Sequence, residues 1–297
     1  MKLIKRKIIK KPKKVYNLHI DKNNNYTANG VVVSNCHGCK AAILESVLEH
    51  AINAKYRFGF TGTMPPSRLD ELTVKSFIGP VIKEYGSKWL HEHGYIAGCD
   101  VNMVTINYKQ KIKGDYNTIK DICFNNPYRV GLIKHILNET NSSVLILVDK
   151  VEKEGAVLKE ILLKSRELKD RTIEFISGKD DAEIREQWRK KTNESKNIIL
   201  IATYAIFQVG VNIKSLDTLI MGSPSKSKIR VLQSIGRTLR KDDGKVGSKI
   251  WDICDQVKYL KDHADIRFRH YNFEGFKIYE VSLSEGDNYN IELKEAD

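Results

Sequence analysis

The chain has 297 residues, of which 41% are hydrophobic, 8% aromatic and 29% charged, with 19 Gly and 6 Pro. This composition is typical of a folded globular protein and excludes collagen-like, low-complexity and disordered classes. The sequence contains neither an apolar run of about 18 residues nor the apolar core of a signal peptide, so we expect a cytoplasmic protein with no membrane partner.

The net charge of +13 is unevenly distributed. Residues 1–35 contain nine Lys/Arg and one acid, Asp21, which gives +8, whereas the other 262 residues carry +5. Such a block indicates either a segment that meets an acidic partner or an arm that contacts nucleic-acid phosphates. Apolar residues interleaved with the Lys favour packing into a partner, namely Leu3, Ile4, Ile8 and Ile9.

The five cysteines predict reduced thiols, because they are scattered along the chain and form no disulfide framework. Cys36 and Cys39 form a C-x-x-C pair, but no second pair exists to complete a zinc site. We therefore expect no bound metal at these cysteines.

In chain order, residues 2–14 form a basic stretch and residues 15–35 are typical of strand, turn and strand, which predicts a short all-β segment. The period changes to helical from Cys36, so a boundary is expected near residue 35. Further strands are expected over 56–61, 101–108, 143–148, 172–177, 197–202, 218–221 and 249–255. Helices are expected over 87–93, 127–138, 151–164, 182–191 and 229–238. This alternation predicts a doubly wound parallel α/β sheet that binds ligands at the carboxyl ends of its strands.

The most informative stretch is 198–240. A strand ends at Thr203, a loop containing Gly210 and another strand follow, and then comes VLQSIGRTLRK. Arg237 and Arg240 are three residues apart, so on a helix they share one face. Two guanidinium groups placed in this way suit the stabilisation of charge on a transferring phosphoryl group.

This stretch resembles motifs V and VI of superfamily-2 helicases, whose second RecA-like domain carries T-x(6)-G-x-[DN]-[IV] and Q-x-x-G-R-x-x-R. The resemblance implies that Arg237 and Arg240 are arginine fingers and that Gly210, Gln233 and Gly236 bind or couple ATP. Residues 144–150 resemble motif IV. Gly178 and Arg185 resemble a G-x(6)-R element that, with Thr203, would contact nucleic acid. Thr61, Gly62 and Thr63 resemble motif III, which couples hydrolysis to strand movement.

The resemblance covers residues 36–260 and is closest in detail to UvsW-type recombination and branch-migration helicases of tailed phages. It implies a phage protein that acts on DNA in the cytoplasm of a bacterial host. The metal-binding motif of the family is D-E-x-H, and Cys36-His37 resembles its second half. The chain has no G-x-x-x-x-G-K-[ST] loop and no Asp-Glu pair placed for Mg²⁺. ATP and Mg²⁺ are therefore expected only in an enzyme completed by an N-terminal half.

Residues 15–36 resemble the C-terminal splicing motifs of inteins, including Ala28-Asn29-Gly30 and the terminal Asn35 before Cys36. The resemblance implies that the Asn35 amide cyclises on its own carbonyl, whereas the Cys36 thiol accepts the upstream chain as a thioester. Three positions depart from the intein pattern. Asn17 replaces the usual Asp, and Asn24 and Ser34 each replace a usual His, so three groups that often assist proton transfer are missing.

A Met start 34 residues before the junction leads us to expect a naturally split intein, whose N-terminal piece carries the first half of the helicase. We expect four parts: a C-terminal split-intein segment (1–35), a remnant of RecA-like domain 1 (36–86), RecA-like domain 2 (87–260) and a C-terminal extension (261–297). Two alternatives stay open. One is a free-standing RecA-like nucleic-acid-binding or regulatory module with a basic arm, and the other is an ATPase built with a partner subunit without splicing.

Overall fold

A computed structural model describes residues 25–28, 31–35, 56–61, 64, 67–209, 213, 216–223 and 247–296. The chain divides into two compact units, residues 1–84 and 85–297. Among the described residues, no helix combines the length and apolar character that crossing a bilayer requires.

The first unit contains a sheet of order β1-β2-β3 and one described helix, with the bounds β1 (Asn25–Ala28), β2 (Val31–Asn35), β3 (Tyr56–Phe60) and α2 (Arg68–Ile78). β1 and β2 are antiparallel, whereas β2 and β3 are parallel in a register that pairs Asn35 with Phe60. The sheet thus extends across the boundary expected at residue 35. The helix expected from Cys36 lies outside the described residues.

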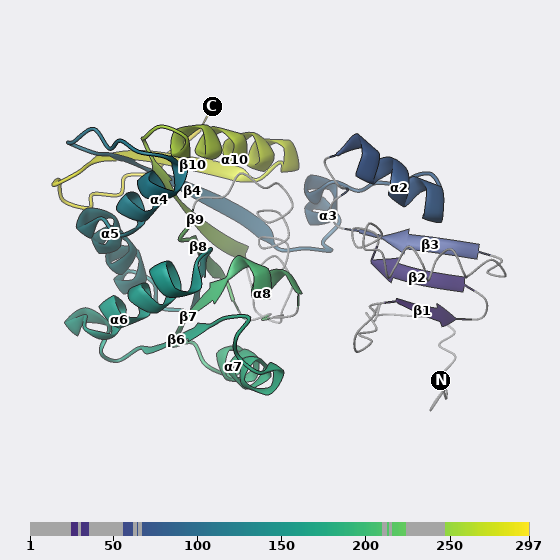
Figure 1. Cartoon of the computed structure of the whole chain (residues 1–297), viewed down its shortest axis with the longest axis horizontal. Coiled ribbons are helices and arrows are strands. Elements are labelled where there is room, and N and C mark those ends of the chain that lie inside the picture. The colour runs from purple at the N-terminus through teal and green to yellow at the C-terminus, as the bar shows by residue number, and fades with distance from the viewer. Residues whose placement is uncertain are drawn as a thin grey trace. The chain divides into compact units, whose positions relative to one another are not determined.

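The second unit is built on a sheet of order β11-β10-β4-β9-β8-β5-β7-β6, in which only the β10–β11 pair is antiparallel among the described strands (Figure 1). Its strands are β4 (Gly98–Asn107), β5 (Val144–Val148), β6 (Thr172–Ile176), β7 (Ile198–Thr203), β8 (Thr218–Met221), β9 (Gly247–Asp255), β10 (Lys277–Ser284) and β11 (Lys294–Glu295). The prediction of a mixed α/β fold with a mostly parallel sheet is confirmed.

The helices of this unit are α3 (Ser87–Glu92), α4 (Tyr116–Phe124), α5 (Pro127–Asn138), α6 (Val157–Leu163), α7 (Ala182–Glu194), α8 (Tyr204–Val209) and α10 (Leu260–Glu274). Two short turns complete it, the π-helical η2 (Val151–Ala156) and the 3-10 turn η3 (Arg166–Leu168). The helix expected over 151–164 therefore begins as a π turn. The helix expected over 229–238 lies outside the described residues.

Both faces of the sheet are buried. Side chains alternate between the two faces along each strand, and apolar residues occupy both sets of positions. On β5, Leu145 and Leu147 belong to one apolar cluster, which also contains residues of α8 and α10. Val144, Ile146 and Val148 belong to the other cluster, which also contains residues of α4, α5 and α6. Each face is thus covered by helices, as a doubly wound sheet requires.

Residues 261–297, expected as a C-terminal extension, contribute to this same sheet. β10 pairs in parallel with β4 along its whole length, and α10 packs against β9 and β10 (Figure 1). Residues 277–295 therefore extend the sheet beyond β4, with β10 beside β4 and β11 at the edge.

Candidate functional site

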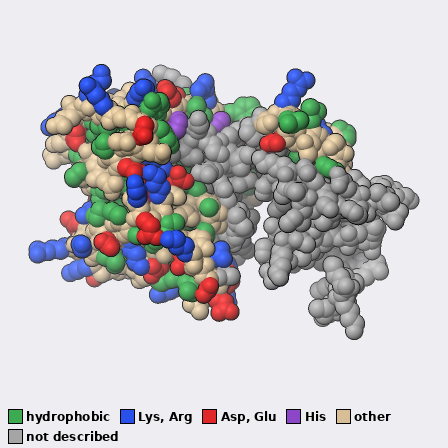
Figure 2. All heavy atoms as spheres, in the orientation of Figure 1, with side chains coloured by type: hydrophobic (Ala, Val, Ile, Leu, Met, Phe, Trp, Pro, Cys, Tyr) green, Lys and Arg blue, Asp and Glu red, His purple; other side chains and the backbone are tan. Residues whose placement is uncertain are grey.

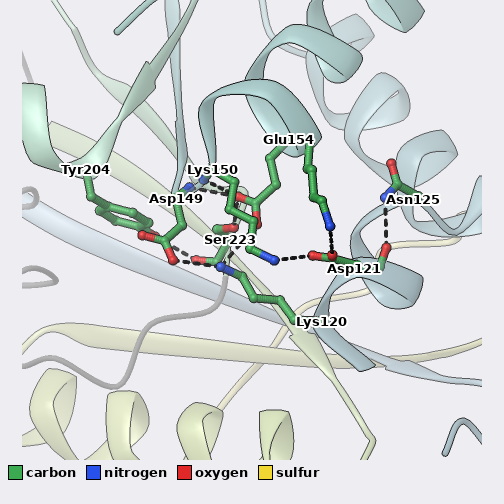
Figure 3. Close-up of polar contacts among 9 residues, drawn as sticks. Lys120, Asp121, Asn125, Asp149, Lys150, Glu154, Tyr204 and Ser223 are labelled. Atoms are coloured by element: carbon green, nitrogen blue, oxygen red, sulfur yellow. Dashed lines mark hydrogen bonds and ion pairs between the residues drawn. The ribbon is translucent and has the colours of Figure 1, made fainter. Parts of the chain in front are cut away.

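The sheet reverses its strand order around β5, because the chain continues from β5 to β6 on one side and later to β8 and β9 on the other. Doubly wound sheets bind ligands outside the carboxyl ends of the strands at such a point. Here those ends lead into Asp149, Tyr204 and Gly222. The polar side chains gathered there define the candidate site (Figure 3).

Glu154 lies at the centre of this edge and is 1% exposed. Its Oε2 atom accepts hydrogen bonds from the backbone N–H of Asp149 (2.7 Å), the N–H of Lys150 (3.1 Å) and the hydroxyl of Ser223. Its Oε1 atom lies 3.1 Å from Nζ of Lys120. One carboxylate therefore connects η2, the loop after β5, the residue after Gly222 and helix α4 (Figure 3).

Lys120 is a buried cation on α4, and its Nζ donates to Oδ2 of Asp149 at 2.8 Å. Burial alone lowers the pKa of Lys120, but the carboxylates of Glu154 and Asp149 outweigh burial and raise the pKa above its ordinary value. Lys120 therefore stays charged at neutral pH, and the two carboxylates satisfy it.

Asp121, the next residue on α4, binds Lys150 and also Lys153, whose Nζ lies 3.1 Å away. Partial burial opposes ionisation of Asp121, but the hydrogen bonds from both lysines hold its pKa below the ordinary value. Helix α4 is therefore attached to the loop after β5 through two neighbouring residues of opposite charge.

Tyr204 begins α8 immediately after β7 and is 1% exposed. Its hydroxyl donates to the carbonyl oxygen of Ser223 at 2.8 Å. Burial, partly offset by the charge of Arg267, raises the pKa of Tyr204, so its hydroxyl is a permanent donor near neutral pH. Ser223 is consequently held through both its carbonyl and its hydroxyl.

Two glycines let the loops at this edge lie close to the strands. A Cβ on Gly155 would lie 2.3 Å from the ring of Phe175, and a Cβ on Gly222 would lie 2.9 Å from the carbonyl oxygen of Leu147. These separations are shorter than van der Waals contact, so both positions need glycine for space.

Three residues expected to contact nucleic acid lie at or just after strands of this sheet. Gly178 follows β6, with no atom within 4 Å of the Cβ position. Arg185 is on α7, and its Nε is buried with no hydrogen-bond partner among the described residues. Thr203 is the last residue of β7 and is 4% exposed. Thr203 is thus less accessible than the sequence suggested.

The other expected residues belong to the first unit or to residues that the structure does not describe. Asn35 is the last residue of β2 and Thr61 follows β3, so the register places the ends of both strands at one sheet edge. The remaining residues with an expected role lie outside the part of the chain that the structure describes. They are Cys36, His37, Gly62, Thr63, Gly210, Gln233, Gly236, Arg237 and Arg240.

Lys120, Glu154 and Ser223 were missed by sequence reasoning. Lys120 belongs to a helix that the sequence pattern does not predict, and for Glu154 the pattern predicts an ordinary helix in place of the π turn. A signal for Glu154 exists in the sequence, because Glu-Gly soon after a buried apolar strand departs from the period of a surface helix.

The described residues do not form a Mg²⁺ site. The Asp70-Glu71 dipeptide lies in the first turn of α2, where Glu71 pairs with Lys75 at 2.5 Å. Within the described ranges no group of three or more His, Cys, Asp or Glu could hold a metal ion. The carboxylates at the edge of the larger sheet form ion pairs with lysines, Glu154 and Asp149 with Lys120, and Asp121 with Lys150 and Lys153.

Residues 129–242 match the profile of the helicase conserved C-terminal domain. The chain is similar to the ATP-dependent DNA helicase uvsW of Enterobacteria phage T4, at 24% identity over 250 residues, 80% of this chain and 48% of that protein. It is also similar to the probable helicase D10 of Escherichia phage T5, at 25% identity over 232 residues, 75% of this chain and 48% of that protein. The chain thus spans about half the length of the curated relatives it matches.

Among solved structures, the chain resembles a fragment of a putative HsdR subunit of a type I restriction enzyme from Vibrio vulnificus YJ016, with a TM-score of 0.63, 17% identity and coverage of 86% of this chain and 48% of that one. It resembles T4 UvsW with a TM-score of 0.51, 21% identity and coverage of 85% and 53%. Together the matches support a helicase C-terminal domain over residues 129–242 and a similarity to phage UvsW, in agreement with the helicase resemblance of the sequence. They do not bear on the resemblance to inteins.

Proposed function

We propose that this chain is the C-terminal half of an ATP-dependent superfamily-2 DNA helicase of the recombination, repair and branch-migration type. The observation that carries the proposal is the coincidence of two features: residues 129–242 match the helicase C-terminal domain, and within that range β5, β7 and β8 end at the reversal of strand order. Ligands bind at such an edge.

In this proposal Arg237 and Arg240 stabilise the charge that develops on the γ-phosphoryl group of ATP, and Gln233, Gly236 and Gly210 couple that event to strand movement. The phosphate-binding loop and the carboxylates that hold Mg²⁺ come from outside these 297 residues, since the sequence contains neither motif. Purified alone, the chain should therefore show no DNA-stimulated ATP hydrolysis.

Gly178 and Arg185 contact the DNA backbone in this proposal. The open space at the Cβ position of Gly178 lets a phosphate approach the main chain. Arg185 is partly exposed, so its positive charge can attract a phosphate, whereas its Nε is buried and has no hydrogen-bond partner among the described residues. Buried Thr203 acts indirectly, by fixing the end of β7.

The helicase half is joined to its N-terminal half by splicing at Asn35–Cys36. Support comes from the intein-like pattern of residues 15–36 and from the +8 charge of residues 1–35, which favours association with an acidic intein fragment. After joining, Cys36-His37 completes a D-E-C-H motif, and the upstream polypeptide supplies its Asp-Glu.

One observation favours a second candidate, a RecA-like nucleic-acid-binding module that is never spliced. β2 ends at Asn35 and pairs in parallel with β3, so residues 31–35 share a sheet with residues beyond the junction. In that case the basic residues 1–35 form an arm that contacts phosphates.

Binding to a labelled DNA duplex, measured by fluorescence anisotropy, tests the nucleic-acid role. Arg185→Ala should weaken binding by about 10-fold, the scale of one charge-assisted phosphate contact. Arg189→Ala is the matched control on the same helix, because Arg189 donates to Glu186 through Nε and Nη2, each at 2.7 Å. Equal losses in both variants would contradict the assignment of Arg185.

A further inference from the structure

The donors around Glu154 form an anion-binding site that the protein fills with its own side chain. We call these groups the carboxylate cradle: the N–H groups of Asp149 and Lys150 and the Ser223 hydroxyl, which donate to Oε2, and the Lys120 ammonium, which forms an ion pair with Oε1. Successive backbone N–H groups at the end of a strand, together with a lysine and a hydroxyl, are the set that α/β proteins use to bind phosphate or carboxylate groups.

Burial explains why the cradle must be filled. Glu154 and Lys120 are each 1% exposed, and Ser223 is fully buried. A buried carboxylate or ammonium is strongly unfavourable unless it is paired and hydrogen-bonded. Removing the carboxylate would leave three neutral donors without their acceptor and would leave Lys120 with Asp149 as its carboxylate partner.

The shape of η2 brings the carboxylate to the cradle. η2 is a π-helical turn, which has a wider ring than an α-helical turn, and it directs Glu154 back over the N–H groups of Asp149 and Lys150 (Figure 3). Gly155 lets this turn lie against Phe175, where a Cβ would not fit. η2 and β6, the strand that carries Phe175, are therefore in direct contact beside Glu154.

The cradle also fixes Ser223. The Ser223 hydroxyl binds Glu154, and its carbonyl accepts from Tyr204 at 2.8 Å. In sequence, Ser223 leads into residues 224–246, which contain Gln233, Gly236, Arg237 and Arg240. The contacts of the cradle thus hold Ser223, the last described residue before that segment.

We propose that Glu154 is a positioning residue whose carboxylate acts as an internal ligand of an anion site and thereby fixes the start of the arginine-containing segment at Ser223. The meaning of that segment rests on the proposed function, whereas the anion site rests on the contacts alone.

Chemical rescue of the full-length chain tests the anion site. Glu154→Ala empties the cradle, so formate should raise the melting temperature by at least about 2 °C more than chloride does at equal ionic strength, by binding only the folded state. Glu154→Gln should not respond, because its amide still fills the space. The control Glu152→Ala removes a 72% exposed carboxylate nearby, so formate and chloride should change its melting temperature equally. Equal responses of Glu154→Ala and Glu152→Ala would overturn the proposal.

Ser223→Ala tests positioning and keeps the proposal falsifiable if Glu154→Ala does not fold. It removes one donor and should speed amide hydrogen exchange both at Asp149 and Lys150 and in peptides covering 224–240. Ser142→Ala is the matched control, because the Ser142 hydroxyl also binds a carboxylate, that of Asp217 at 2.5 Å, at the opposite end of β5. Unchanged exchange in Ser223→Ala, or the same change in Ser142→Ala, would refute positioning. If the joined protein lacks ATPase activity, the proposed function fails, while the formate result still decides the anion site.

Discussion

Arg267 on α10 forms a buried ion pair with Asp252 on β9. It donates to both carboxylate oxygens of Asp252, at 2.7 and 2.8 Å, and Asp252 also accepts from the Tyr271 hydroxyl at 2.8 Å. Arg267→Ala leaves a buried carboxylate without its cation, so we expect a loss of about 3–5 kcal/mol in the free energy of unfolding. Urea titration measures it. Arg189→Ala breaks a pair near the surface, in which Arg189 is 28% and Glu186 49% exposed, and should cost about 0–1 kcal/mol; similar values for the two variants would contradict this account.

Asn35 and Cys36 have separable roles at the proposed junction. Asn35→Ala removes the amide that cyclises, so a branched intermediate carrying both upstream and downstream chains on Cys36 should accumulate in mixtures with the N-terminal fragment. Cys36→Ala removes the acceptor thiol, so joining should stop while Asn35 can still cleave the 35–36 bond. Mass spectrometry distinguishes the two results, and joined product from either variant would exclude splicing at this bond.

At the scale of elements, Gly155 in η2 and Gly178 after β6 differ in their surroundings. Gly155→Ala places a Cβ 2.3 Å from the Phe175 ring and should destabilise the protein by about 1–3 kcal/mol. Gly178→Ala meets nothing within 4 Å and should change stability by less than about 0.5 kcal/mol, while weakening DNA binding if a phosphate approaches there. Thermal unfolding and anisotropy separate these effects. Comparable destabilisation by both variants would contradict the packing described for η2.

The central strands were predictable because they are short, apolar and bounded by turn residues. β5 and β8 end at the expected residues, and β7 ends at Thr203, the strand end from which the motif comparison starts. α4 and α10 were missed: α4 carries Lys120 and Asp121 on a short helix, and α10 buries Arg267, so polar residues face inward in both. Their pairing with distant carboxylates is a tertiary effect that no local period reveals.

The candidate site was predictable only in part, for the same reason. Sequence order placed Gly178 just after a strand and Thr203 at the end of one, as the structure has them. The carboxylate cradle could not be derived, because its donors come from α4, the loop after β5 and the residue after Gly222, and only folding brings them together.

For the molecule as a whole, stability should fall at alkaline pH. Burial raises the pKa of Tyr108, Tyr204 and Tyr271, and it raises the pKa of Cys123 to about 12. The folded state therefore keeps protons that the unfolded chain loses from about pH 8.5 for Cys and about pH 10 for Tyr. Stability is fully present below those values and is lost as pH rises, by about 1.4 kcal/mol per pH unit for each group.

Urea titrations between pH 7 and pH 11 measure this decline. Tyr204→Phe removes one titrating hydroxyl and should reduce the slope above pH 10 by about 1.4 kcal/mol per pH unit. An unchanged slope in Tyr204→Phe would show that the Tyr204 pKa is not raised in the folded state.

Charge on the larger unit is mixed on the face shown in Figure 2, where Lys and Arg lie among Asp and Glu. The strong positive block lies in residues 1–35 by sequence. Association with an acidic fragment should therefore slow markedly between about 50 mM and about 500 mM salt, because screening weakens electrostatic steering. Stopped-flow mixing measures the rate, and a rate independent of salt would indicate an apolar interface.

The most direct test of the central claim is peptide mapping, by mass spectrometry, of this protein isolated from its native source. If the chain is the C-terminal half of a spliced helicase, Cys36 will be found joined to an upstream sequence that ends in Asp-Glu, and residues 1–35 will be missing from the helicase. If Cys36 is found only after Asn35, in a protein that retains residues 1–35 and is active on DNA, splicing is excluded and the unspliced RecA-like module is the correct assignment.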